Sequence, residues 1–204
     1  MSQRDYFLLS PASTSGRRAR MLLAPGAGFE LARRVQAGGA PIGEVFSFLS
    51  GLYFRGKLGY ARRFARSPEA IRIITSDRGL MSPDLPVTRE DLVAMASSEI
   101  DAANPGYRSP FARDADRLAA SLEPGDQVIL LGSIATGKYA DVLLAALADR
   151  LAFPAEFIGR GDMSRGGLLL RAADAGTELA YIPISGTTRR GQRPPRLEPR
   201  KLRE

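Results

Sequence analysis

The sequence predicts an α/β fold: a mainly parallel five-stranded sheet with helices on both faces. Two observations favour it. Five short apolar runs, each bounded by turn-forming residues, alternate along the chain with stretches of helical periodicity. The runs are continuously apolar instead of alternating with polar residues, as is typical of strands buried on both faces of a parallel sheet. The helices between them would then be the crossovers that parallel strands require.

In the first half of the chain, a strand is predicted at 6–9 and the next at 70–75. About three helices, at 29–37, 42–50 and 52–65, are predicted as an insertion after the first strand that forms a flank or cap. The last of these helices has an apolar side, and its basic residues lie mostly away from it.

In the second half, strands are predicted at 127–131, 155–158 and 178–184. Helices are predicted at 88–99, 110–122, 139–151 and 164–173. The first of these begins with Thr88 and Asp91 at the spacing of a capping box, with Asp in place of the usual Glu or Gln. The last is the weakest pattern because it contains two glycines.

The chain is predicted to form a single α/β domain over 1–188, followed by a basic, proline-rich tail over 189–204. Of the 29 basic and 22 acidic residues, seven and two respectively lie in this tail, which therefore carries +5 of the net charge of +7. Three prolines and few apolar residues argue against a packed helix or central strand there. The tail is either a solubilising extension or an arm attracted to phosphates.

Composition excludes several classes of site. The 204 residues include no Cys and no His, so disulfides, zinc–thiolate sites, Ser-His-Asp triads and His-carboxylate metal sites are excluded. We expect no metal and no cofactor. No run approaches the ~20 apolar residues of a membrane span, and the first residues lack the apolar length of a signal peptide. The cytoplasm is therefore the expected location, without a membrane partner.

Ligands of open α/β sheets bind beyond the carboxyl ends of the strands. The segments that follow the five predicted strands, at 10–18, 76–84, 132–138, 159–167 and 185–191, are rich in Gly, Ser or Thr and carry Arg or Lys. These residue types offer amides, hydroxyls and positive charge to an anion. We expect the five segments to converge at one edge of the sheet.

The segment "GSIATGK" at 132–138 has most of the pattern of a phosphate-binding P-loop. Tyr139 stands where a small hydroxyl residue should ligate magnesium, the loop follows the third predicted strand instead of the first, and no later strand ends in a metal-binding Asp. We therefore expect a glycine-rich turn that holds one phosphate, assisted by Lys138, and no nucleotide hydrolysis.

Asp77 and Asp162 each follow a predicted strand end and are the candidate catalytic residues. Facing one another across the crevice, they would orient a water molecule without any His. For each one taken alone, a role as a turn former or helix cap is the stronger explanation.

Several short motifs resemble known families. "GLYFRGKLGYARRFA" (51–65), "IITSDRGLMSPDLPV" (73–87) and "QVILLGSIATGKYADVL" (127–143) are similar to segments of a bacterial and phage domain family of unknown function. "FLLSPASTSG" (7–16) more loosely resembles the start of the YaaA-like peroxide-stress proteins, which are associated with DNA binding. Ser13 replaces the Lys of that pattern. The resemblance implies an α/β fold and a nucleic-acid context, but no reaction.

Three functions stay open. The leading one is a nucleic-acid-associated protein, for DNA in preference to RNA, with a phosphate- or base-binding crevice and a possible base-excising activity. The alternative is an enzyme acting on a small phosphorylated or nucleotide-like substrate. A scaffold that uses Tyr53, Phe54 and Tyr60 in an interface is the third. The residues predicted to bind an anion or nucleic acid are Ser10, Ser13, Thr14, Arg17, Arg18, Arg55, Lys57, Arg78, Gly132, Ser133, Thr136, Gly137, Lys138, Arg160 and Arg165.

Overall fold

The computed structural model describes residues 5–187 together with 191, 192, 194, 195 and 197. Its main sheet has six strands in the order β4-β3-β1-β6-β7-β8, and a separate two-stranded sheet pairs β2 with β5. The strands are β1 (Asp5–Leu9), β2 (Ala40–Pro41), β3 (Ile71–Ile74), β4 (Leu80–Met81), β5 (Pro86–Val87), β6 (Gln127–Leu131), β7 (Leu151–Pro154) and β8 (Tyr181–Pro183).

The predicted α/β class is confirmed, but the sheet is mixed at its edges. Strands β3, β1, β6 and β7 run parallel, whereas the edge strands β4 and β8 are antiparallel to their neighbours. Strand β1 lies between β3 and β6. The chain passes from β1 to β3 on one side and later returns past β1 to β6 on the other, so the strand order reverses at β1. Such a switch point is where open α/β sheets bind ligands.

Two strand predictions were wrong in detail. The strand expected at 155–158 lies at Leu151–Pro154 instead, because helix α7 ends at Leu147 and the φ of 48° at the following residue, Ala148, stops the helix before its predicted end. The run predicted at 178–184 forms a strand only over Tyr181–Pro183 and is antiparallel to β7. Its carboxyl end therefore points to the amino edge of the parallel strands.

The helices agree with the sequence patterns more closely than the strands do. They are α1 (Arg17–Leu23), α2 (Glu30–Ala37), α3 (Ile42–Ser50), α4 (Leu52–Phe64), α5 (Arg89–Ser97), α6 (Pro105–Ser121), α7 (Ala140–Leu147) and α8 (Asp162–Ala175), with 3₁₀ turns η1 (Pro68–Ala70), η2 (Ala148–Arg150) and η3 (Ala155–Phe157). The insertion after β1 contains four helices, since α1 was not predicted. The capping box of Thr88 and Asp91 is confirmed.

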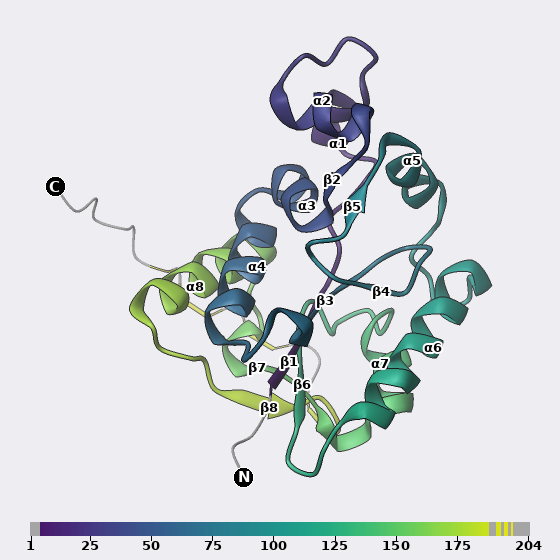
Figure 1. The fold of residues 1–204 in the computed structure, drawn as a ribbon. Helices are drawn as coiled ribbons and strands as arrows, with labels where there is room; N and C mark the ends of the chain where they lie inside the picture. Colours follow the sequence, from purple (N-terminus) through teal and green to yellow (C-terminus); the bar gives the residue numbers. More distant parts are fainter. Residues whose placement is uncertain (1–4, 188–190, 193, 196, 198–204) are drawn as a thin grey trace, which may run out of the picture.

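Helices cover the two faces of the main sheet, with α4 and α8 on one side and α6 and α7 on the other (Figure 1). Helices α1, α2, α3 and α5 gather with β2 and β5 beyond the carboxyl edge of the parallel strands. This group forms a cap above the point where β1 ends. No helix within the described residues is long and apolar enough to cross a membrane.

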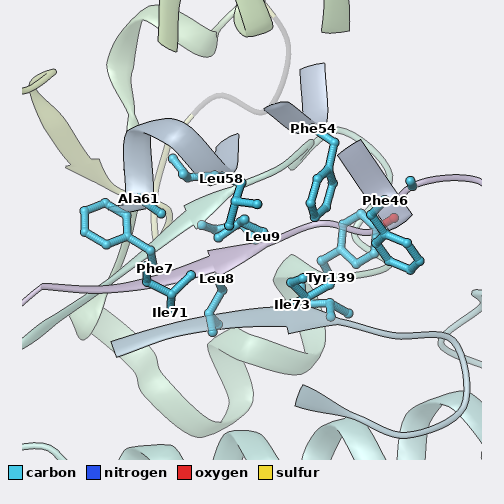
Figure 2. Packing of buried hydrophobic residues seen from close by; sticks show 14 of the residues in the cluster. Phe7, Leu8, Leu9, Phe46, Phe54, Leu58, Ala61, Ile71, Ile73 and Tyr139 are labelled. Carbon is cyan, nitrogen blue, oxygen red and sulfur yellow. The ribbon is translucent and has the colours of Figure 1, made fainter. Parts of the chain in front are cut away.

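The core lies between the sheet and these helices. Phe7, Leu8 and Leu9 of β1 are completely buried. Figure 2 shows Leu58 and Ala61 of α4 packed over this strand. Packing of this kind fixes α4 relative to β1, so residues on the first turns of α4 are held rigidly at the carboxyl end of the strand.

Helices α4 and α8 cross at two glycines. A Cβ atom on Gly56 would lie 2.6 Å from the carbonyl oxygen of Gly166, and one on Gly166 would lie 2.7 Å from the Cα atom of Tyr53. Both distances are below any real contact, so only glycine allows the two backbones to approach this closely. The crossing brings the start of α8 beside the start of α4.

Most of the tail predicted at 189–204 lies outside the described residues. Among its described residues, Pro195 accepts a hydrogen bond from the Arg160 guanidinium at 3.2 Å, and Leu197 lies near Gly167.

Candidate ligand-binding site

A cavity of about 700 Å³ opens at the carboxyl ends of the three adjacent strands β3, β1 and β6. For each strand, the first or second residue after its end lines the cavity: Ser10 after β1, Ser76 after β3 and Ser133 after β6. The lining residues are Ser10, Pro11, Ala12, Ser13, Thr14, Ser15, Phe46, Leu49, Ser50, Tyr53, Ser76, Met95, Ala96, Ser97, Ser98, Glu99, Ile100, Ser133, Lys138, Tyr139 and Asp162. The cavity thus lies at the predicted edge, beneath the helical cap.

The predicted convergence of loops is confirmed for three of the five segments. Ser10, Ser76 and Ser133 all line the cavity. Ser185 lies at the opposite edge, where its hydroxyl donates to Asp149 at 2.8 Å just before β7, because β8 is antiparallel. Gly159 is absent from the lining, since a 3₁₀ turn separates it from the end of β7.

Ser10 is the first residue after β1, and a lysine from α4 holds it from beneath. The Lys57 Nζ atom lies 2.9 Å from the Ser10 Oγ atom and also donates to the Ser10 carbonyl oxygen. The Ser10 hydroxyl lies 3.3 Å from the Leu131 carbonyl oxygen at the end of β6. The serine is therefore fixed between two strands and one helix.

Lys57 is almost completely buried, with 1 % of its surface exposed. No carboxylate among the described residues pairs with it; its Nζ atom instead lies over the Tyr53 and Phe54 rings, 4.4 and 4.8 Å from their centroids. Burial lowers the pKa of Lys57 to about 7, partly offset by the charge of Asp162. The amine is therefore neutral in a substantial fraction of molecules near neutral pH.

Tyr53, one turn before Lys57 on α4, lines the same cavity. Its hydroxyl is buried and has no hydrogen-bond partner among the described residues. Burial raises the pKa of Tyr53 to about 12, whereas nearby Arg165 and Ser10 lower it slightly. The phenol is therefore protonated at neutral pH and has a donor available for a ligand.

The start of α8 supplies a carboxylate to the cavity. Asp162 is the first residue of this helix and lines the cavity, with a largely exposed side chain. The Arg165 guanidinium lies 3.6 Å from it, is mostly buried, and donates to the Phe157 carbonyl oxygen. Arg165 thus holds η3 and Asp162 in place and is not itself part of the cavity wall.

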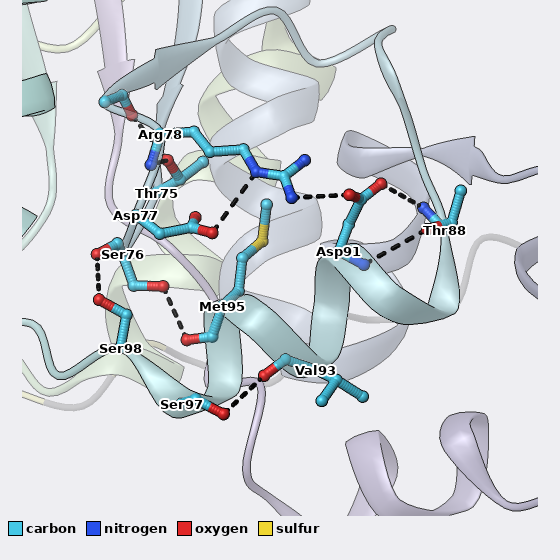
Figure 3. Close-up of polar contacts among 11 residues, drawn as sticks. Thr75, Ser76, Asp77, Arg78, Thr88, Asp91, Val93, Met95, Ser97 and Ser98 are labelled. Carbon is cyan, nitrogen blue, oxygen red and sulfur yellow. Dashed lines mark hydrogen bonds and ion pairs between the residues drawn. The ribbon is translucent and has the colours of Figure 1, made fainter. Parts of the chain in front are cut away.

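A third wall comes from α5 and the residues after it. Figure 3 shows the Ser76 hydroxyl donating to the Met95 carbonyl oxygen at 2.7 Å, and the Ser98 hydroxyl donating to the Ser76 carbonyl oxygen at 2.7 Å. These bonds fasten the end of β3 to the end of α5. They also place the Met95 side of α5 opposite the aromatic residues of α3 and α4.

The segment that resembles a P-loop contributes two residues to the cavity. Ser133 and Lys138 line it, whereas Thr136 is exposed elsewhere and Gly137, with a φ of 73°, forms the turn before α7. Gly132 is packed against Ser10, because a Cβ atom there would lie 2.9 Å from the Ser10 Cβ atom. The Lys138 carbonyl oxygen accepts a hydrogen bond from the Tyr107 hydroxyl, which anchors the turn on α6.

The two predicted catalytic carboxylates do not share the cavity. Asp162 lines it, but Asp77 does not; Figure 3 shows Asp77 beside the Arg78 guanidinium, at 3.4 Å. Burial raises the pKa of Asp77. Arg78 in turn forms an ion pair with Asp91 of α5 at 2.6 Å. Asp77 and Arg78 therefore hold the β3–β4 turn against α5.

The predicted basic residues separate into groups. Arg18 and Arg55 line a separate hollow of about 410 Å³, and none of its lining residues lines the cavity. Arg17 is exposed on the same helix as Arg18. Arg160 lies away from the cavity and bonds to Ser164 and Pro195. Ser13 and Thr14 line the cavity.

Sequence patterns missed the aromatic part of the site. Tyr53 was considered only for a protein interface, and Tyr139 only as a departure from the P-loop pattern. A usable signal was present: Tyr53 and Lys57 are four residues apart on one helix, and a lysine on the apolar side of a helix is unusual enough to indicate a buried amine.

Comparisons of the chain with protein-family models, with curated proteins and with solved structures find no match. The family resemblances in the sequence therefore stay predictions.

Proposed function

We propose that the protein binds a small nucleotide-like molecule in the cavity at the carboxyl edge of the sheet and acts on it as an enzyme. The observation that carries this proposal is the cavity itself, at a switch point, with a buried tyrosine hydroxyl that lacks a partner. Its volume of about 700 Å³ is within the range of about 300–1,000 Å³ of small-molecule sites.

The character of the lining favours a flat molecule with a polar rim over a bare anion. Hydroxyl residues from four loops make up much of the wall, and Phe46, Met95 and Tyr139 supply an apolar part. The charged lining residues are Lys138, Glu99 and Asp162, so the cavity is not strongly positive. A nucleoside suits this mixture, because its base is an apolar plate and its sugar carries hydroxyl groups.

Each polar residue has a role in this proposal. The Tyr53 hydroxyl and the Asp162 carboxylate would bond to hydroxyl or amino groups of the base or sugar. Lys138, at the turn before α7, would contact a phosphate where one is present. The serines after β1 and β3 would supply further hydrogen bonds.

Binding of nucleosides and nucleoside monophosphates is expected to raise the melting temperature. A ligand at one hundred times its Kd stabilises a folded protein by about 2.7 kcal/mol, which corresponds to roughly 5–10 °C for a chain of this size. Tyr53→Phe removes the unpartnered hydroxyl and should weaken binding about tenfold. Thermal melting and isothermal titration calorimetry with adenosine, guanosine, cytidine, uridine and their monophosphates measure both effects.

Ser121→Ala is the matched control, since Ser121 lines a different groove beside α6 and its loss should leave affinity unchanged. The proposal is wrong if none of these compounds raises the melting temperature, or if Tyr53→Phe and Ser121→Ala bind equally well.

A second candidate is a nucleic-acid-binding protein whose cavity receives one extruded nucleotide. The observation that favours it is the separate hollow lined by Arg18 and Arg55 at the helical cap, whose guanidinium groups would contact the adjoining phosphates. In this version Asp162 would orient a water molecule toward the extruded base.

Removal of these arginines is expected to reduce the salt dependence of DNA binding. Each lost phosphate contact lowers the log–log slope by roughly 0.7–0.9, so Arg18→Gln with Arg55→Gln should lower it by about 1–2 units. Arg117→Gln, on the groove beside α6, removes a charge elsewhere and should not change the slope. Fluorescence anisotropy of a labelled oligonucleotide between low and moderate salt measures it; no affinity at low salt, or an equal slope for all proteins, contradicts this candidate.

A further inference from the structure

The contact between Ser10 and Lys57 has the geometry of an activated nucleophile. Ser10 lines the cavity and has 6 % of its surface exposed. The Lys57 Nζ atom lies 2.9 Å from that hydroxyl oxygen and is shielded from solvent by the Tyr53 and Phe54 rings. A buried amine beside a reachable serine is one of the arrangements that replaces histidine in nucleophilic catalysis.

The amine has no other acid–base partner of its own. The charged and titratable groups around it are Asp162 and Arg165 on α8 and Tyr53 on α4. None of them forms an ion pair or hydrogen bond with Lys57 among the described residues. In its neutral form the amine has two hydrogens, of which one reaches the Ser10 carbonyl oxygen, and one lone pair. The Ser10 hydroxyl donates to the Leu131 carbonyl oxygen at 3.3 Å, so its hydrogen must turn from that long bond to the Lys57 lone pair before the proton can transfer.

We propose that Ser10 is a nucleophile that takes an acyl group from an ester or amide bound in the cavity, with Lys57 accepting its proton. This inference rests on the proposed function, because the rest of the substrate is the nucleotide-like molecule that the cavity holds. Tyr53, whose buried hydroxyl has no partner, is the donor to the carbonyl oxygen. Lys57 lies behind Ser10 and exchanges protons with the groups that meet at the Ser10 oxygen.

In the first step the Ser10 Oγ atom forms a bond to the carbonyl carbon, and the hydroxyl proton passes to the Lys57 amine. The carbonyl π electrons move to its oxygen, which the Tyr53 hydroxyl stabilises. When this oxyanion collapses, the bond to the leaving oxygen or nitrogen breaks, and Lys57 returns the proton to the leaving group. Water then attacks the acyl-serine with Lys57 again accepting a proton, and release of the carboxylic acid restores the Ser10 hydroxyl.

Acylation by p-nitrophenyl acetate tests this inference. The full-length protein is expected to release one equivalent of nitrophenolate in a burst and to gain one acetyl group, which peptide mass spectrometry places on Ser10. Because the neutral amine is the reactive form, the burst rate should rise through about pH 7 and level off above it. A pH profile of this kind would not arise from a merely structural lysine.

Three variants sharpen the test. Ser10→Ala should abolish the burst, and Lys57→Met should slow it about 100-fold, as is typical for loss of a general base. Ser121→Ala, in the groove beside α6, should react as the unaltered protein does. Melting temperature confirms that each variant is folded, and Lys57→Arg, which retains a cation but has no titration near pH 7, should not restore the rate.

Failure of this inference and failure of the proposed function have different signatures. If nucleosides bind but no acetyl group appears on Ser10, or if the rate is the same at pH 6 and 8, the inference is overturned and the binding function stands. If Ser10 is acetylated with the expected pH profile but no nucleotide-like compound binds, the nucleophile is supported and the proposed function is overturned.

Discussion

Replacement of Gly166 by alanine is expected to destabilise the protein by about 3 kcal/mol and to abolish ligand binding in the cavity. A Cβ atom at this position would lie 2.7 Å from the Tyr53 Cα atom and 2.8 Å from the Leu52 carbonyl oxygen. Both are backbone atoms of α4, which cannot move away by a change of rotamer as a side chain can, so the whole helix must shift. The shift outweighs the gain of up to about 1 kcal/mol that alanine brings to a helix interior.

The effect on binding follows from what α4 carries. Tyr53 lines the cavity and Lys57 holds Ser10, so a displaced α4 alters two walls of the site at once. A change of about 3 kcal/mol corresponds to a fall of roughly 6–12 °C in melting temperature for a chain of this length. Thermal melting gives the first quantity, and calorimetry with the nucleoside that binds the unaltered protein gives the second.

Gly59→Ala is the matched control on the same helix. A Cβ atom there would meet only the Leu170 Cδ2 atom, at an ordinary 3.9 Å. This variant should be as stable as the unaltered protein or more stable, by up to about 1 kcal/mol, with unchanged binding. Equal stability of the Gly166 and Gly59 variants would show that the two helices can separate without cost and that the crossing does not position the site.

The sequence predicted the α/β class, the parallel centre of the sheet and most helices, because these depend on local periodicity. It misplaced β7 by four residues, since the end of α7 depends on the backbone conformation of Ala148 and not on a change in hydrophobic pattern. It also took β8 for a parallel strand. A run of apolar residues has no direction, so only the pairing with β7 decides where Ser185 lies.

The cavity lies at the edge of the sheet where the candidate site was predicted, but only some of the predicted residues line it. Ser10, Ser133 and Lys138 follow from strand ends, where the sheet topology fixes their place. Asp77 does not reach the cavity because Arg78, bridged to Asp91, holds the turn away. Tyr53 is placed at the cavity by the crossing of α4 and α8. This is a tertiary contact, and two glycines far apart in the sequence do not predict it.

The last expected result concerns Lys57 and the pH dependence of stability. Its pKa is about 7 in the folded protein, below the ordinary value of 10.5. Between these two values the unfolded chain binds a proton that the folded protein does not, so stability rises with pH across this window. The penalty of the buried charge is fully present below pH 7 and is relieved as pH approaches 10.5.

Lys57→Met isolates this contribution, because methionine fills the same buried space without a charge. The slope for one proton is at most about 1.4 kcal/mol per pH unit. The stability of the unaltered protein relative to Lys57→Met should therefore rise by about 2–3 kcal/mol between pH 7 and 9.5. At pH 9.5 about one pH unit of the penalty, roughly 1.4 kcal/mol, remains, and the bonds to Ser10, worth about 1 kcal/mol, offset most of it. The two proteins should therefore be closely similar in stability there, whereas Lys57→Met should be clearly the more stable near pH 6.

Urea unfolding of both proteins at pH 6, 7, 8 and 9.5, at constant ionic strength, measures the difference. Tyrosines with raised pKa values, such as Tyr53 and Tyr60, destabilise the folded state only above about pH 10 and are common to both proteins, so they do not affect it. A difference that stays constant with pH would mean that Lys57 keeps its proton at pH 9.5 in the folded protein. Lys57 would then not be a base for Ser10 near neutral pH. If the stability difference instead rises with pH, the pH at which the rise begins gives the pKa of Lys57 in the folded protein.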